Sequence, residues 1–224
     1  MASAFLDWAV GVDRSNSDGY SIAPGVVTDN TNFLLEGRVQ VRIPSLPSFE
    51  PWARMVSVGA GSSRGFMWLP QMDDEVLVGF NQNDERDAYI LGGLWSTIDR
   101  PPTIIPTDFL SKRILKTGLA GGLGHSIEFD DALQSVTIET STQQTITIDP
   151  KKIEIATTGG VQKLVLDLTS ATVSVEVAVG NIELKAPLGT ISLKAMDVSI
   201  EGTLSTTVSA GLECSIKGLP VKLN

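Results

Sequence analysis

Residues 146–155 read ITIDPKKIEI, and this stretch decides the fold of the second half of the chain. Two apolar-polar-apolar triplets flank a turn that contains Pro150. Alternation with a period of two puts the isoleucines on one side of a strand and the Thr and Glu side chains on the other. The stretch therefore predicts two short strands, each with one apolar face, joined by a corner.

The same triplet recurs through residues 127–200, and neighbouring triplets start mostly seven to eleven residues apart, with turn-forming residues between them. Residues 111–224 show no helical spacing over the roughly dozen residues that a stable helix needs, so no helix can cover the apolar faces. The strands must cover one another. The predicted core positions are the apolar members of the triplets: Ile127, Phe129, Ile146, Ile148, Ile153, Ile155, Ile182, Leu184, Ile191, Leu193, Val198 and Ile200.

Two architectures bury such faces: a single-chain solenoid, or several identical chains wound together. A solenoid of roughly twenty or more residues per turn would give about five turns with open edges, whereas three intertwined chains close every layer. Twelve of the thirteen aromatic residues precede residue 110, as expected if a thin core of Val, Ile and Leu follows. We therefore expect an intertwined triple-stranded β-helix over residues 120–224, a trimeric needle.

The first half predicts a different all-β unit. Strands are expected at 35–43, 52–58, 65–69, 75–81 and 89–95, which fits a five-stranded OB-fold barrel over residues 22–108, followed by a linker at 109–119. Large rings on strands are mostly buried. The predicted barrel core therefore includes five aromatic side chains: Trp52, Phe66, Trp68, Phe80 and Trp95.

Residues 1–21 predict a short helix and a flexible connector. Ser3 is a candidate N-cap for a helix that carries Phe5, Trp8 and Ala9 on one face and ends at Gly11. Such a helix is too short to be stable unaided. It either folds back on its own barrel or docks on another protein, and we predict a hub contact at Phe5, Leu6 and Trp8.

Composition limits the classes of partner and compartment. The net charge is −9, and residues 1–110 carry seven Arg and no Lys against fourteen acids. An acidic chain without a basic cluster argues against nucleic-acid binding. The amino terminus lacks a basic region, and no apolar run approaches the roughly twenty residues of a membrane span. We expect synthesis in the cytoplasm without a signal peptide.

The residues of common catalytic and metal sites are scarce. His125 is the one histidine and Cys214 the one cysteine. We interpret His125 as a turn residue between barrel and needle, and Cys214 as a small buried hydrophobe beside Leu212 and Ile216. The paired acids at 73–75, 84–87 and 130–131 are interpreted as solvated turns. We therefore predict no enzymatic activity, no catalytic residues, no cofactor and no metal.

The barrel region contains six short fragments: GRVQVRIP at 37–44, WAR at 52–54, GF at 65–66, LP at 69–70, DEVLVGF at 74–80 and LGGLW at 91–95. In order and spacing they resemble the barrel domain of the central spike proteins of contractile injection systems. That family includes the phage baseplate protein gpV and the VgrG proteins of type VI secretion. The segment GHSIEFDD at 124–131 is similar to the family's junction between barrel and β-helix.

The resemblance implies a homotrimeric spike that pierces membranes, mounted on a separate hub protein of the baseplate. It implies assembly into a virion tail or an extracellular or secretion injection particle that fires at a target cell envelope. The family's apical iron site uses a His-x-His pattern that residues 217–224 lack, so no apical metal is expected. A flat apolar end is expected to bind a PAAR-repeat tip protein through Leu219, Pro220, Val221, Leu223 and Asn224.

Two alternatives remain open at this point. One is a glycan-binding barrel on a single-chain β-solenoid, which predicts a monomer with exposed aromatic side chains. The other is a polysaccharide lyase or hydrolase on a solenoid, which predicts charged residues clustered along one wall; the charges of residues 111–224 are scattered singly instead.

Overall fold

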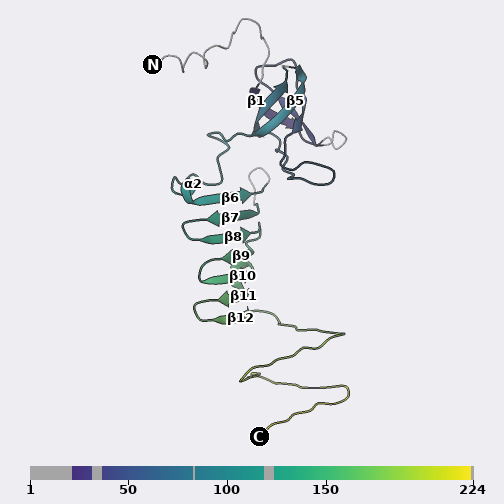
Figure 1. The fold of residues 1–224 in the computed structure, drawn as a ribbon, viewed down its shortest axis with the longest axis vertical. Coiled ribbons are helices and arrows are strands. Elements are labelled where there is room, and N and C mark those ends of the chain that lie inside the picture. The colour runs from purple at the N-terminus through teal and green to yellow at the C-terminus, as the bar shows by residue number, and fades with distance from the viewer. Residues whose placement is uncertain (1–21, 32–36, 83, 119–123, 223–224) are drawn as a thin grey trace, which may run out of the picture. The chain divides into compact units, whose positions relative to one another are not determined.

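The computed structural model describes residues 22–31, 37–82, 84–118 and 124–222. Strands dominate in these residues, and helical structure is limited to the four-residue α2 (Asp108–Ser111) and the 3-10 turn η2 (Thr158–Gly160). The strands form a closed five-stranded barrel and a separate seven-stranded sheet (Figure 1). The predicted all-β class, with an OB-like barrel followed by a sheet-rich part, is confirmed. The predicted helix and hub contact at Phe5, Leu6 and Trp8 lie outside the described residues.

The barrel strands follow the order β1-β2-β3-β5-β4, with β4 returning to β1. Neighbours are antiparallel except β3 and β5, which run parallel where the barrel closes. Short connections keep most neighbours adjacent in sequence, as expected for a small meandering barrel. The strands are β1 (Ile22–Asp29), β2 (Arg38–Arg42), β3 (Trp52–Met55), β4 (Glu75–Asn81) and β5 (Asp84–Gly93).

Alternation along the strands builds the barrel core. On β2, Val39 and Val41 are fully buried, whereas Arg38 and Arg42 face outward. Full burial of each aliphatic side chain contributes roughly 1.5–3 kcal/mol. One contiguous cluster results, made of Ala23, Val27, Val39, Val41, Ile43, Ala53, Val76, Val78, Phe80, Ala88 and Ile90.

A glycine permits the close approach of two barrel strands. A Cβ atom added to Gly25 on β1 would lie 2.5 Å from Cγ1 of the buried Val41 on β2. In the register of these two strands, Val27 lies opposite Val41. Only a residue without a side chain fits this inward position.

A polar cluster on the outer surface supports the parallel closure. Arg54 of β3 pairs with Tyr89 of β5, and its guanidinium lies 4.5 Å from the centre of the Tyr89 ring. The same guanidinium forms an ion pair with Asp87 at 3.3 Å, and Asn81 donates to Asp87 at 2.8 Å. These groups, the Asn81 hydrogen bond first, lower the pKa of the Asp87 carboxyl. The side chains of this cluster therefore join β3, β4 and β5 beside the short parallel ladder between β3 and β5.

Two predicted strand positions differ from the structure. Residues 22–29 form β1, although Pro24 and Gly25 argue against a strand in sequence. Pro24 is tolerated because β1 pairs with β2 only from Val26 onward, so that Pro24 has a partner strand, β4, on one side only. Residues 65–69 form no strand, because their backbone finds no partner ladder beyond single bonds such as Phe66 N–H to Val58 O at 3.0 Å.

The predicted aromatic core is therefore only partly correct. Phe80 is buried and Trp52 is half-buried. Phe66, Trp68 and Trp95 were expected inside, but 49%, 38% and 71% of their surfaces are exposed. Phe66 and Trp68 lie on the 65–69 segment, and Trp95 follows the end of β5, so none of the three lies on a barrel strand.

The second half begins with an antiparallel sheet in which every strand pairs with its neighbours in sequence, in the order β12-β11-β10-β9-β8-β7-β6 (Figure 1). A sheet of successive hairpins is not a coiled solenoid, so the single-chain solenoid does not describe this region. Its strands are β6 (Lys112–Lys116), β7 (Ser126–Asp130), β8 (Ser135–Glu139), β9 (Thr145–Ile148), β10 (Lys152–Ala156), β11 (Gln162–Asp167) and β12 (Thr172–Val177).

The turns at one end of the strands, which follow β7, β9 and β11, each contain an aspartate. Asp130, Asp149 and Asp167 each end a strand or follow it directly. Each carboxylate accepts hydrogen bonds from the backbone N–H groups two and three residues further on, at 2.7 to 3.0 Å. This Asx geometry closes each turn locally.

The turns at the opposite end of the strands, which follow β6, β8 and β10, each contain a threonine. The hydroxyls of Thr117, Thr140 and Thr157 accept the backbone N–H of the residue that precedes the next strand or begins it, at 2.9 to 3.1 Å. The backbone N–H of each threonine donates to the carbonyl oxygen of that same residue at 2.8 to 3.0 Å. Aspartate and threonine turns thus alternate and favour hairpins within one chain.

Residues 180–224 form a second unit, and its described part, 180–222, contains no strand. Intertwining was predicted from residue 120 onward. The backbone groups of 126–177 instead pair within the chain, because the short closed turns bring successive strands together.

Candidate functional site: the apolar face of the seven-stranded sheet

The register of the sheet places nearly all of its apolar side chains on one face. Directly opposed residues share a face in an antiparallel pair. Following the pairs from β6 to β12 gives two parallel columns of side chains. The first contains Leu115, Ile127, Ile138, Ile146, Ile155, Leu164 and Val175, and the second contains Arg113, Phe129, Val136, Ile148, Ile153, Leu166 and Val173.

These columns remain open to solvent in the single chain. Exposed fractions include 47% for Phe129, 46% for Ile148, 45% for Ile155 and 72% for Val173. A contiguous apolar surface that runs across seven strands is far more than a soluble monomer usually exposes. We define this surface as the assembly face.

The opposite face is polar and carries ion pairs. Lys112 bonds Glu128 at 2.8 Å, and Lys152 bonds Glu154 at 2.6 Å. The acidic partner is the main cause that raises the pKa of each lysine. Thr137 and Thr147 lie opposite each other between these pairs. The polar face is therefore compatible with exposure to water, whereas the assembly face is expected to pack against a protein partner.

The structure brings together six of the predicted core residues, Ile127, Phe129, Ile146, Ile148, Ile153 and Ile155, and all six lie on the assembly face. Sequence reasoning omitted seven further members of the columns, although most belong to triplets of the same kind, such as Val136-Thr137-Ile138. The omitted members are Leu115, Val136, Ile138, Leu164, Leu166, Val173 and Val175.

The other six predicted core residues lie in the strandless second unit. Exposed fractions are 56% for Ile182, 71% for Leu184, 51% for Ile191, 68% for Leu193, 50% for Val198 and 69% for Ile200. Cys214 was expected to be buried but is exposed in the single chain, because neither Leu212 nor Ile216 is covered there. Among the described residues, the backbone of 180–222 has no strand partner.

The predicted tip residues are only partly described. Leu219 and Pro220 are exposed and Val221 is 49% exposed. Leu223 and Asn224 lie outside the described residues.

His125 has a structural setting before β7. Its Nδ1 accepts the backbone N–H of Ser141 at 3.3 Å, which links two threonine turns. A Cβ added to the preceding Gly124 would lie 1.6 Å from the carbonyl oxygen of Thr117, so the chain can pass here only with glycine. In the part of the chain that the structure describes, no group of three or more His, Cys, Asp or Glu side chains gathers as a metal site would require.

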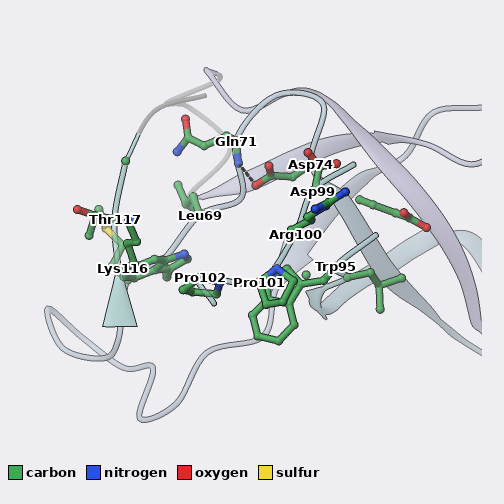
Figure 2. A pocket seen from close by; sticks show the side chains of 16 residues that line it. Leu69, Gln71, Asp74, Trp95, Asp99, Arg100, Pro101, Pro102, Lys116 and Thr117 are labelled. Carbon is green, nitrogen blue, oxygen red and sulfur yellow. Dashed lines mark hydrogen bonds between the residues drawn. The ribbon is translucent and has the colours of Figure 1, made fainter. Parts of the chain in front are cut away.

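A cavity of about 920 Å³ adjoins the barrel. Figure 2 shows its lining, in which the backbone N–H of Gln71 donates to Asp74 at 2.7 Å. Met67, Trp68 and Trp95 contribute apolar wall, and Asp99 and Arg100 contribute charge. The remaining lining residues are Leu69, Glu75, Gly93, Leu94, Pro101, Pro102, Lys116, Thr117 and Gly118.

Comparison with known proteins identifies the barrel. Residues 23–95 match a family model described as the type VI secretion system/phage-baseplate injector OB domain. The barrel is thus similar to the injector OB domain, and we name it the injector OB domain after this match. The predicted resemblance to the gpV- and VgrG-type baseplate spike family is thereby confirmed, because the match covers four of the five barrel strands in full and all but one residue of β1.

A relative shows a likeness that extends beyond the injector OB domain. The type VI secretion system spike protein VgrG3 of Vibrio cholerae serotype O1 is 30% identical over 102 residues. That alignment covers 42% of this chain and 10% of VgrG3, so this chain matches about a tenth of the length of its relative.

The described residues contain no helix with the length and apolar character that a membrane-spanning helix needs.

Proposed function

We propose that the chain is a structural, non-enzymatic spike that works as a homotrimer at the tip of a contractile injection machine. The proposal assigns residues 22–108 to the barrel, 109–119 to a linker and 120–224 to the spike. That linker includes β6 (Lys112–Lys116), which already belongs to the sheet of the spike. The observation that carries it is the assembly face: an ordered sheet leaves one whole apolar face open, and three copies would cover all three faces at once.

The two parts of the spike would assemble differently. The sheet has satisfied its backbone hydrogen bonds within the chain, so three sheets would pack face against face through side chains. Residues 180–222 have no strand partner within the described part of their own chain, so they would form strands by pairing with the other two copies. Buried backbone polar groups must find partners, and this argues that intertwining is confined to the second unit.

The injector OB domain supports the wider setting. Family membership of the barrel and the VgrG3 relative support a place in a phage baseplate or type VI machine. By that resemblance the trimer would be mounted on a hub protein, with Phe5, Leu6 and Trp8 as the hub contact. It would enter a virion tail or injection particle after cytoplasmic synthesis, and would pierce the target envelope on firing.

The end of the chain is proposed to carry a separate PAAR-repeat tip protein. Leu219, Pro220 and Val221 are exposed in the single chain, and Leu223 and Asn224 complete the predicted contact. Deletion of residues 219–224 should abolish binding of the tip protein and leave the trimer intact. Retention of the tip protein by the truncated trimer would count against this contact.

Light scattering of the purified chain tests the trimer directly. The expected mass is three times 23.9 kDa. A stable, well-folded monomer would overturn the proposal.

A second candidate function is a glycan-binding barrel, which the exposed Phe66, Trp68 and Trp95 rings favour. That candidate predicts a monomer that binds envelope oligosaccharide.

A further inference from the structure

The injector OB domain exposes apolar side chains that its own core does not use. Phe66 and Trp68 stack with ring centres 5.7 Å apart and an interplanar angle of 9°. Met67 is 86% exposed and Trp95 is 71% exposed. Met67, Trp68 and Trp95 line the same cavity, so they belong to one surface. We define Phe66, Met67, Trp68 and Trp95 as the aromatic strip.

The aromatic strip is held in place although it is exposed. The backbone N–H of Phe66 donates to Val58 O at 3.0 Å, and the Ser57 hydroxyl donates to Phe66 O. A surface that is ordered and apolar, that borders a cavity, and that stays exposed among the described residues is typical of a protein contact.

A second apolar surface lies on the segment that connects the barrel to β6. Ile104, Ile105, Phe109 and Leu110 are 60%, 55%, 53% and 81% exposed. This segment does not cover the aromatic strip of its own chain: Pro101 and Pro102 line the cavity, but none of these four residues does. We define the four residues as the linker patch.

We propose that, in the trimer, the linker patch of each copy packs on the aromatic strip of the next copy. The inference rests on the proposed trimer. Both surfaces belong to segments next to β6, where Leu115 begins a column of the assembly face, and Lys116–Gly118 border the cavity. Three parallel copies joined through that face would place these segments of neighbouring copies at the same end of the shared interface. One patch and one strip per copy form a heterologous contact that closes into a ring of three.

Two methionines in the same loop region make this testable without altering the sequence. In the single chain Met67 is 86% exposed and Met72 is 53% exposed, and Met72 does not line the cavity. Methionine oxidation follows accessibility. Mild peroxide treatment of the full-length assembled protein, read by mass spectrometry, should therefore oxidise Met67 at least about threefold more slowly than Met72, the reverse of the order that single-chain exposure predicts.

A linker variant identifies the occupant. Ile104→Ser/Ile105→Ser should make Met67 oxidise faster than Met72 while the mass remains that of a trimer, because the assembly face is untouched. The matched control is Leu133→Ser/Leu168→Ser, which changes two exposed turn residues of the sheet. It should leave Met67 protected.

The outcomes separate this inference from the proposed function. A trimer in which Met67 oxidises faster than Met72 overturns the inference and leaves the proposed spike standing. Protection that persists in the linker variant assigns another occupant to the strip and also overturns it. A folded monomer overturns both.

Discussion

At the residue scale, single positions without a side chain set the geometry of the injector OB domain. Gly25 faces inward against Val41, which is fully buried, so a Cβ at Gly25 would force the Val41 side chain to shift within a packed core. Gly92, on β5, has no atom within 4 Å of the position where a Cβ would lie. The two glycines therefore make opposite predictions for the same substitution.

Gly25→Ala should destabilise the barrel by about 1–3 kcal/mol, the range for overpacking a core. Gly92→Ala is the matched control and should change stability much less. Chemical denaturation followed by tryptophan fluorescence measures both. Equal midpoints for Gly25→Ala and the unaltered protein would contradict the close approach of β1 and β2.

The burial of single aromatic side chains could be predicted from the sequence in some cases and not in others. Phe80 was placed correctly because regular alternation on β4 points it inward with Val76 and Val78. Trp68 was misplaced because residues 66–69 form a short continuous apolar run, which is consistent with a buried strand. Whether such a segment finds a partner strand depends on distant residues. Trp95 was misplaced because a strand end cannot be located to within a residue or two by pattern.

At the element scale, the two faces of the sheet predict different responses to the same charge. Ile138→Glu/Ile146→Glu places carboxylates in the first column of the assembly face, where three copies would bury them without partners. Thr137→Glu/Thr147→Glu places them on the polar face at the adjacent pair.

The first variant should lose the trimer, measured by light scattering, and the second should keep it. A trimer that survives the two substitutions on the assembly face would show that another surface holds the copies together. Loss of the trimer in both variants would indicate that the strands, rather than the face, had been damaged.

The aspartate turns predict an acid-sensitive sheet. Backbone N–H groups lower the pKa of Asp149 and Asp167, the larger causes being the N–H of Lys151 and of Ser170 respectively. A pKa that is lower in the folded than in the unfolded state stabilises the fold above about pH 3.9, the ordinary value for aspartate. That stabilisation is lost as pH falls through the lowered pKa.

Thermal melting between pH 6 and pH 2 should therefore show a drop in Tm that begins near pH 4. Asp149→Asn/Asp167→Asn should shrink the drop, because the amide oxygen still accepts the turn hydrogen bonds but no longer titrates. An unchanged pH profile in that variant would mean that these two turns do not carry the acid sensitivity.

Sequence established the apolar face of the sheet but not its strand partners. Period-two triplets such as Ile146-Thr147-Ile148 put the same residues on the same face whether the neighbouring strand comes from one chain or three. The deciding signal is in the turns, where Asp130, Asp149 and Asp167 alternate with Thr117, Thr140 and Thr157. Those residues are common in turns of every kind, so their spacing is informative only once the hairpins are seen.

At the scale of the whole molecule, the one thiol reports on the second unit. Cys214 is exposed in the single chain. If residues 180–222 intertwine as proposed, alternation turns Cys214 inward with Leu212 and Ile216, and three copies cover it.

The native protein should react with a thiol reagent such as DTNB at least about tenfold more slowly than the protein in denaturant, because a reactive cysteine needs exposure. A Cys214→Ser variant supplies the blank. Rapid labelling of a trimer of the correct mass would show that the second unit stays open after the sheets have assembled.

The pairing of each strand from β6 to β12 with its sequence neighbour bears on the order of events during synthesis. Hairpins between adjacent segments need only short loops to close, so they form early and quickly. Residues 112–177 can therefore adopt their pairing as soon as they leave the ribosome. If the last forty-odd residues intertwine as proposed, they must wait until two sister chains are present, and their maturation becomes the step that depends on concentration.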